Sequence, residues 1–352
     1  MNGAAAIASS RSFRDVRLSG GGTLAEVTIA YRAMGRLNAA ADNAVLVLHG
    51  YTTGPSMLEA GANVAEGSWS ALVGPGKAID TERWFVLCPN MLGSSYGSTG
   101  PGSMNPETGK AYGADFPRIG VEDIVATQAM LLDALGVRRL AAAVGPSFGG
   151  YQALQWGVMY PDFVERVVAA VSAPFNPPSA VLVAPALAQL ELQPEWNGGH
   201  PAPGAMLPFL VRMRMATLQR YGVEAELAAR FPGEQARAAE LQRIAREWAE
   251  GFDAGSLVVL ARAAESFDVR ARLGELRAPL LWVLSRTDAV FPPALARELA
   301  PLLDAAGVRW SYTELDSDFG HLASGADARL WSPLLAEFMA TDAEQWRSRG
   351  LQ

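Results

Sequence analysis

Apolar runs alternate with amphipathic segments along most of this chain. Most of the apolar runs lack polar alternation, which is typical of strands buried on both faces of a parallel sheet. They are Val27–Gly35, Ala44–Gly50, Arg83–Asn90, Leu140–Gly145, Arg166–Ser172, Pro279–Ser285 and Trp310–Asp316. Between several of them lie helical patterns, as in residues 121–135, where apolar residues recur at helical spacings before Gly136. This alternation predicts a doubly wound, mostly parallel α/β sheet.

The alternation breaks within residues 177–268, which contain helical patterns, Pro and Gly clusters and no strong strand run. The charged stretch "EQARAAELQRIAREWAEGF" inside this segment is typical of a helix with one solvated face. A helical insertion between strands is expected to cover the carboxyl edge of the sheet, where open α/β sheets bind ligands. We therefore expect a core formed by residues 1–176 and 269–352 and a helical lid formed by residues 177–268.

Composition narrows the class of protein. Of the 352 residues, 50% are hydrophobic and 18% are charged, which supports a large buried core. The formal net charge is −7 and no run of Lys or Arg occurs, so a nucleic-acid partner is not expected. No stretch approaches the roughly 20 apolar residues that span a bilayer. We expect a cytoplasmic protein whose first 15 residues form a ragged N-terminus.

Cofactor and metal motifs are absent from the sequence. No G-x-G-x-x-G follows an apolar run, "GPGKA" lacks the spacing and hydroxyl of a phosphate-binding loop, and no histidine pair has the spacing of a zinc site. The single cysteine, Cys88, lies in an apolar run and is expected to be buried. We expect no metal and no bound cofactor.

Ser147 stands in "GPSFGG", after the apolar run that ends at Gly145 and before the helical stretch "YQALQWGVMYP". Strand, tight turn and helix with small residues around a serine form the nucleophile elbow of α/β hydrolases. A serine hydroxyl needs a base at neutral pH, and histidine is the usual one. Ser147 is therefore our candidate nucleophile.

The chain has three histidines, of which His321 follows the last predicted strand by a short loop. His49 is expected to shape a turn by its backbone, and His200 lies in a loop of the insertion. Asp288 follows another predicted strand by three residues, and the order Ser147, Asp288, His321 is that of an α/β-hydrolase triad.

Two further acids compete with Asp288 for the role of orienting the histidine. Asp316 and Asp318 are nearer to His321 in sequence, so they remain alternatives at this stage. The oxyanion of an acyl-enzyme also needs backbone donors. We expect the N–H of Phe148, together with that of Tyr51 or Thr52 in "HGYTTG".

Several blocks together resemble the homoserine O-acetyltransferase family of α/β hydrolases. They include "PNMLGSSYGSTGPGSMNPETGKAYGADFPRIGVEDIV", "GPSFGGYQAL", "TDAVFPP" and "ELDSDFGH", and the resemblance runs from about Val27 to about Met339. It implies a helical lid, a ping-pong reaction through an acyl-serine, and a homodimer. Ser147, Asp288 and His321 fall on the triad positions of the family.

The chain departs from the family at positions that bind the acceptor. The residue after the catalytic histidine is usually an aspartate in the family, whereas here it is Leu322. The lid arginine that holds the acceptor's carboxylate in the family matches Arg212, although "RMATLQ" after it differs. Loss of a carboxylate that pairs an ammonium removes a contact worth about 1.5–3 kcal/mol. Recognition of homoserine is therefore not expected to be intact.

We expect an esterase that moves a short acyl group from an ester through Ser147 to water, because Leu322 favours a less polar alcohol portion. The alternative is an O-acetyltransferase that uses acetyl-CoA as co-substrate, with homoserine or another hydroxyl compound as acceptor. A non-catalytic binding protein of the same fold is a remote third reading. In each case the partner is a small molecule.

Overall fold

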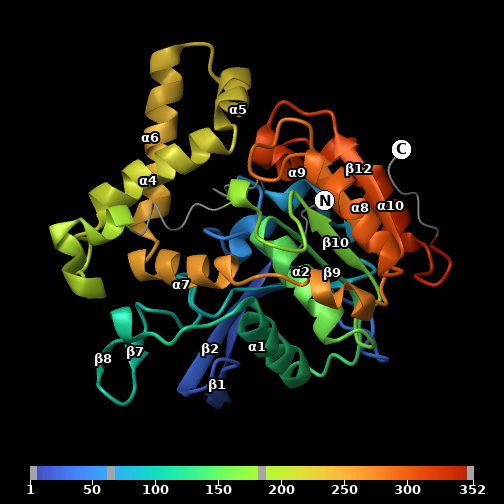
Figure 1. Ribbon diagram of the computed structural model, residues 1–352, viewed down its shortest axis with the longest axis horizontal. Helices are drawn as coiled ribbons and strands as arrows, with labels where there is room; N and C mark the ends of the chain where they lie inside the picture. Colours follow the sequence, from blue (N-terminus) through green and yellow to red (C-terminus); the bar gives the residue numbers. More distant parts are fainter. Residues whose placement is uncertain (1–5, 62–67, 181–187, 347–352) are drawn as a thin grey trace.

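An eight-stranded sheet lies at the centre of the protein (Figure 1). The computed structural model describes residues 6–61, 68–180 and 188–346. The strands, in sheet order, are β1 (Ile7–Arg17), β2 (Thr23–Met34), β6 (Phe85–Pro89), β3 (Ala44–Val47), β9 (Leu140–Pro146), β10 (Val167–Ala170), β11 (Leu280–Ser285) and β12 (Trp310–Leu315). Neighbours from β6 to β12 pair in parallel, and β2 runs antiparallel to β1 and β6. The predicted doubly wound α/β sheet is confirmed.

Strand β1 was not expected. Residues Ile7 to Arg17 pair with β2 in one continuous antiparallel register, from Ile7 opposite Ala33 to Arg17 opposite Thr23. Nearly all of this strand is exposed, because it forms an edge of the sheet, so no apolar run marks it in the sequence. The expectation of a ragged N-terminus was therefore wrong for these residues, and residues 1–5 lie outside the described part.

Two apolar cores fill the two faces of the sheet. Successive residues of β11 pack alternately in the two cores. Leu280, Trp282 and Leu284 lie in the first core, and Leu281 and Val283 lie in the second. The first core lies under α1 (Val121–Ala134), α2 (Phe148–Met159) and α8 (Ala294–Ala305), and the second lies under α10 (Ser332–Ala340). Strands β3, β9, β10 and β11 are buried along their whole length, which explains why they read as continuous apolar runs.

Short elements complete the chain between these strands and helices. They are β4 (Val73–Gly74), β5 (Ile79–Asp80), β7 (Met104–Asn105), β8 (Lys110–Ala111), α9 (Ala323–Ala326) and the 3₁₀ turns Pro55–Leu58, Trp69–Ala71, Gly113–Asp115, Pro178–Ala180, Pro194–Gly199, Arg270–Glu275, Gly320–Leu322 and Ala328–Leu330. Cys88 is fully buried in β6, as the sequence indicated.

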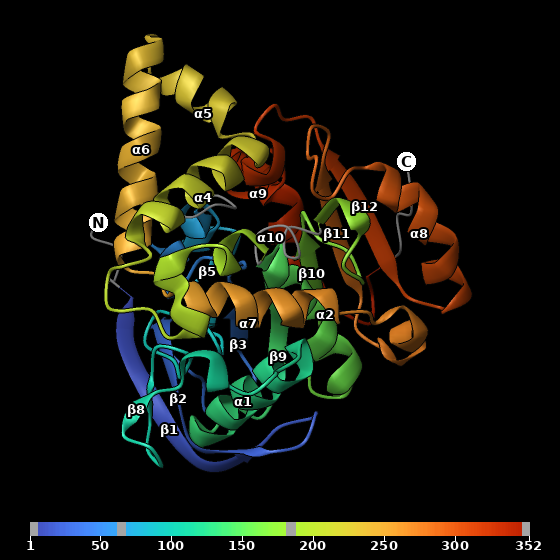
Figure 2. The ribbon, with the colours of Figure 1, turned by 60° about the vertical axis from the view of Figure 1, so that its left-hand side comes forward.

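Helices α4 (Leu207–Arg220), α5 (Val223–Arg230), α6 (Glu234–Glu250) and α7 (Ala254–Glu265) lie between β10 and β11. The chain leaves and returns to the core at one neck, where Asn176 N donates to Phe267 O at 3.1 Å and Val269 N donates to Pro174 O at 2.9 Å. Figures 1 and 2 both show α5 and α6 projecting from the body, whereas α7 lies across it beside α2. In the described part of the chain, no helix is both long and apolar enough to cross a membrane.

Candidate active site

Ser147 occupies the turn between β9 and α2. Its backbone has φ 55° and ψ −123°, a conformation that residues with side chains rarely adopt. The turn is tight enough to exclude side chains on both sides, because a Cβ at Gly145 would lie 2.6 Å from the Leu48 carbonyl oxygen and one at Gly149 would lie 2.0 Å from it. The Ser147 carbonyl accepts hydrogen bonds from Gly150 N and from Ser172 Oγ at 2.9 and 2.8 Å, which hold the strained residue in place.

The three predicted side chains form one hydrogen-bonded line. His321 Nε2 lies 2.9 Å from Ser147 Oγ, and His321 Nδ1 lies 2.8 Å from Asp288 Oδ2. An ionised carboxylate only accepts, so Nδ1 carries the proton and Nε2 is left to accept from the serine hydroxyl. Both His321 and Asp288 are buried, which keeps this line dry.

The position of Asp288 is fixed by its other oxygen. Asp288 Oδ1 accepts from the backbone N–H groups of Val290 and Phe291 at 2.7 and 3.1 Å. The competing acids lie elsewhere, since Asp316 and Asp318 are exposed and both pair with Arg286. Asp288 is thus the acid that contacts His321.

The other histidines do not contact Ser147. His200 lies half-exposed, 3.9 Å from Asp115. His49 is fully buried, and its Nδ1 donates to the Gly50 carbonyl at 2.9 Å. Burial lowers the pKa of His49 to about 4, against the opposing effect of the Gly50 carbonyl and the Asn90 side chain, so His49 is neutral at pH 7.

The sequence of this chain is similar to those of known proteins. Residues 43–325 match the family model of the alpha/beta hydrolase fold. A homoserine O-acetyltransferase of Moorella thermoacetica is 35% identical over 332 residues, which cover 87% of this chain and 88% of the relative. The chain belongs to the homoserine O-acetyltransferase family of α/β hydrolases.

Two solved structures have folds closely similar to that of this chain. The crystal structure of homoserine O-acetyltransferase from Bacillus anthracis has a TM-score of 0.85 at 26% identity, with 96% of this chain and 99% of that one covered. The structure of esterase E22 has a TM-score of 0.82 at 26% identity, with 95% and 100% covered. Family membership makes this protein an enzyme with a serine-based triad, so the reading as a non-catalytic binding protein is set aside.

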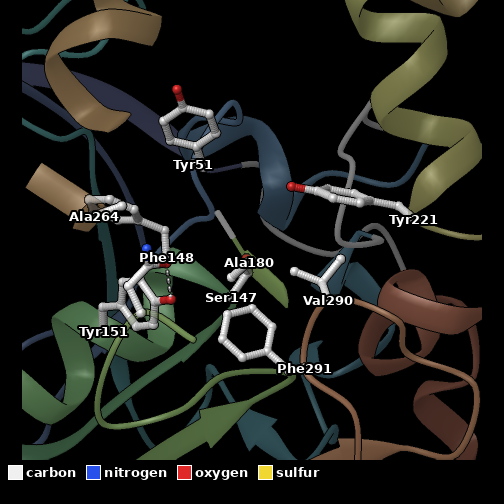
Figure 3. Close-up of a pocket in the computed structure, with 10 residues that line it drawn as sticks. Tyr51, Ser147, Phe148, Tyr151, Ala180, Tyr221, Ala264, Val290 and Phe291 are labelled. Atoms are coloured by element: carbon white, nitrogen blue, oxygen red, sulfur yellow. Dashed lines mark hydrogen bonds between the residues drawn. The ribbon is translucent and has the colours of Figure 1, made fainter. Parts of the chain in front are cut away.

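A cavity opens beside Ser147 (Figure 3). Its described lining consists of Tyr51, Ser147, Phe148, Tyr151, Asn176, Ala180, Tyr221, Ala264, Val290 and Phe291. The lining joins the loop after β3 (residues 49–54, the predicted oxyanion loop), α2, the predicted lid and the loop that carries Asp288. Among these ten described residues there is no carboxylate, ammonium or guanidinium. The cavity wall is therefore mostly apolar and uncharged.

Tyr51 and Thr52 are in different surroundings. Tyr51 lines the cavity with Ser147, and its ring stacks on Phe148 with ring centroids 6.2 Å apart. Thr52 is turned to the lid, since its carbonyl accepts from Trp248 Nε1 at 2.8 Å and its hydroxyl oxygen accepts from Arg214 at 2.7 Å. Of the two predicted loop donors, Tyr51 is the one whose residue lines the cavity together with Phe148.

Arg212, the arginine predicted to bind the acceptor, is not among the described residues that line the cavity. Arg212 lies on the exposed face of α4. Arg214, two residues later, is fully buried, and its guanidinium carbon lies 4.8 Å from the centroid of the Trp248 ring. Buried residues recur at Leu210, Arg214, Leu218 and Tyr221, so this spacing of four, four and three is the signal that distinguishes the two arginines.

Leu322 does not line the cavity as expected. Its side chain is 2% exposed and packs in the first apolar core, although its neighbour His321 reaches Ser147. The sequence position after His321 therefore carries no carboxylate that could pair an acceptor's ammonium. No group of three or more His, Cys, Asp or Glu residues that could hold a metal ion occurs in the part of the chain that the structure describes.

We predict that Asp288→Asn lowers the rate of Ser147 acylation by about three to four orders of magnitude, because an amide favours the wrong tautomer of His321. The measurement is the pre-steady-state burst with p-nitrophenyl acetate. Asp316→Asn is the matched control and should keep the burst rate of the wild type. An equal loss in both variants would contradict the assignment of Asp288.

Proposed function

We propose that this enzyme takes a short, uncharged acyl group from a thioester onto Ser147 and passes it to the hydroxyl of a small acceptor that carries a carboxylate. Acetyl-CoA is the first donor to test. The observation that carries the proposal is Arg214, a fully buried guanidinium on α4 that donates to Thr52 Oγ1, next to Tyr51 in the cavity wall. Relatives that are named as acyltransferases, among them homoserine O-acetyltransferases and a serine O-succinyltransferase, support transfer over the esterase that we first expected.

The triad accounts for both half-reactions. His321 Nε2 removes the proton of Ser147 as Oγ attacks the thioester carbonyl, and the N–H groups of Phe148 and Tyr51 stabilise the oxyanion. Collapse of this intermediate expels the thiolate, which takes the proton from His321. The acceptor hydroxyl then gives its proton to His321 Nε2 and attacks the acyl-serine, and return of that proton to Ser147 Oγ releases the product ester.

The apolar cavity wall favours a short, uncharged acyl group. Phe148, Val290 and Phe291 form an apolar side of the cavity next to the serine hydroxyl. A dicarboxylic acyl group would place a second carboxylate against this wall, and burial of an uncompensated charge is costly. An acetyl group or another short alkyl acyl group fits this wall without that cost.

Arg214 and Leu322 together favour an acceptor that carries a carboxylate and needs no ammonium. Tyr221, seven residues after Arg214, lines the cavity, and Arg214 donates to Thr52, next to Tyr51 in the cavity wall. A guanidinium in this place can hold a carboxylate by two parallel hydrogen bonds. With Leu322 after His321, the acceptor needs no ammonium group.

Hydrolysis is the second candidate function. It is favoured by Leu322 and by the structural similarity to esterase E22. The same triad would then activate water in place of the acceptor hydroxyl. The two candidates differ in whether a hydroxyl compound accelerates turnover of the acyl-enzyme.

The test measures thiol release from acetyl-CoA with four acceptors at equal concentration: L-homoserine, L-serine, 4-hydroxybutyrate and 1-butanol. We expect acceptor-dependent release with the carboxylate-bearing compounds, and little with 1-butanol. L-homoserine and 4-hydroxybutyrate should differ by less than about tenfold in kcat/KM. With Leu322 in place of a carboxylate, the ammonium of homoserine gains no ion pair, so it should add less than the free energy of one tenfold change, about 1.4 kcal/mol. Rapid hydrolysis of p-nitrophenyl acetate without any acceptor-dependent thiol release would overturn transfer in favour of the esterase.

Arg214→Gln is expected to lower kcat/KM for a carboxylate-bearing acceptor by about 10- to 100-fold, since a charge-assisted contact of about 1.5–3 kcal/mol is lost. Acylation by p-nitrophenyl acetate should stay within a few-fold of the wild type. Arg214→Lys keeps the positive charge but loses the forked geometry of the guanidinium. Its kcat/KM for the carboxylate-bearing acceptor should lie between those of the wild type and Arg214→Gln. Arg212→Gln, on the same helix, is the control and should leave all rates unchanged; an effect of Arg212→Gln alone would refute this assignment.

A further inference from the structure

A chain of buried side-chain hydrogen bonds lies behind the nucleophile elbow. Trp156 Nε1 donates to Gln128 Oε1 at 2.8 Å, Gln128 Nε2 donates to Gln152 Oε1 at 2.7 Å, and Gln152 Nε2 donates to the His49 carbonyl at 3.0 Å. All four residues are fully buried. The chain joins α1, α2 and the loop after β3, which are far apart in the sequence.

The two ends of this chain fix its direction. An indole N–H only donates, and a backbone carbonyl only accepts. Between these ends each glutamine amide can have one orientation, with its oxygen toward Trp156 and its nitrogen toward His49. Reversal of either amide would place two donors or two acceptors face to face inside the protein, which is costly.

The chain ends at the oxyanion loop. The His49 carbonyl that accepts from Gln152 is two residues before Tyr51, and Gln152 is one helical turn after Phe148. Next to this hydrogen bond the backbones themselves touch, since a Cβ at Gly149 would lie 2.0 Å from the Leu48 carbonyl oxygen. The contact at Gly149 limits how closely the loop and the elbow approach, and the Gln152 hydrogen bond limits how far they separate.

We infer that Gln152 is a positioning residue that holds the oxyanion loop on the elbow, so that the N–H groups of Tyr51 and Phe148 keep one spacing. Hydrogen bonds between amides fix both the orientation of the side chains and the distance between the loop and the elbow, whereas apolar packing is not directional. The inference rests on the acyl-Ser147 step of the proposed function. That step is common to transfer and hydrolysis, so the inference is independent of the acceptor.

The test compares Gln152→Met with Gln155→Met. Methionine keeps the length of glutamine and removes its hydrogen bonds, and Gln155 is a buried glutamine on the same helix outside the chain of hydrogen bonds. For Gln152→Met we expect kcat for p-nitrophenyl acetate hydrolysis to fall by about 10- to 100-fold with KM within about twofold, because loss of one oxyanion donor costs about 10²–10³ and a misplaced donor costs less. Gln155→Met should keep the kcat of the wild type.

A transition-state analogue separates positioning from a loss of folding. The inhibition constant of a short-chain trifluoromethyl ketone should rise in Gln152→Met by the same factor by which kcat/KM falls, because its oxyanion uses the same donors. Trp156→Phe removes only the indole N–H from the far end, so it should give a smaller, several-fold loss; it remains a test if Gln152→Met does not fold.

The outcomes are distinct. Wild-type acylation in both Gln152→Met and Trp156→Phe would overturn this inference and leave the proposed function intact. A fall in Gln152→Met that appears only in KM, or equally in Gln155→Met, would also overturn it. If the wild type forms no acyl-enzyme, the proposed function fails and this inference fails with it.

Discussion

The close backbone approach between the elbow and the loop after β3 is the constraint on which this site depends. Only glycine at position 149 leaves room for the Leu48 carbonyl, and this close approach sets the distance between the elbow and the loop from which Phe148 and Tyr51 are proposed to donate. The strained backbone of Ser147 is part of the same arrangement, since its φ of 55° turns the hydroxyl out of the sheet toward His321. The strained backbone of Ser147, the close approach of Gly149 to the Leu48 carbonyl and the hydrogen bond from Ser147 to His321 therefore depend on one another.

The oxyanion loop is held from two sides. From the core, Gln152 donates to the His49 carbonyl. From the lid, Trp248 donates to the Thr52 carbonyl and the Tyr51 hydroxyl donates to the Leu257 carbonyl on α7. These hydrogen bonds tie the predicted lid to the loop after β3. Because Arg214 also bonds Thr52, the residue proposed to hold the acceptor is in direct contact with the loop proposed to stabilise the oxyanion.

The sequence predicted what depends on long apolar patterns and on residue order. Seven of the eight strands of the sheet, α1 and the meeting of Ser147, Asp288 and His321 were predicted, because the carboxyl ends of parallel strands lie at one edge of the sheet. Strand β1 was missed because an exposed edge strand needs no apolar side chains.

The errors within the site have a different physical origin. Arg212 and Arg214 are the same residue type two positions apart, and only their phase relative to Leu210 and Leu218 separates them. The role of Gln152 depends on two partners that are distant in sequence, Gln128 and His49, so no local pattern indicates it. Pairwise contacts of this kind require the three-dimensional structure.

The most direct test of this account is the mass of the protein quenched within milliseconds of mixing with acetyl-CoA in the absence of acceptor, with peptide mapping of the modified residue. The account predicts an acetyl group on Ser147 that is absent from Ser147→Ala and disappears when a carboxylate-bearing alcohol is added. Acceptor-dependent thiol release with no acetyl group on Ser147 at any time would contradict it, because transfer would then bypass the serine.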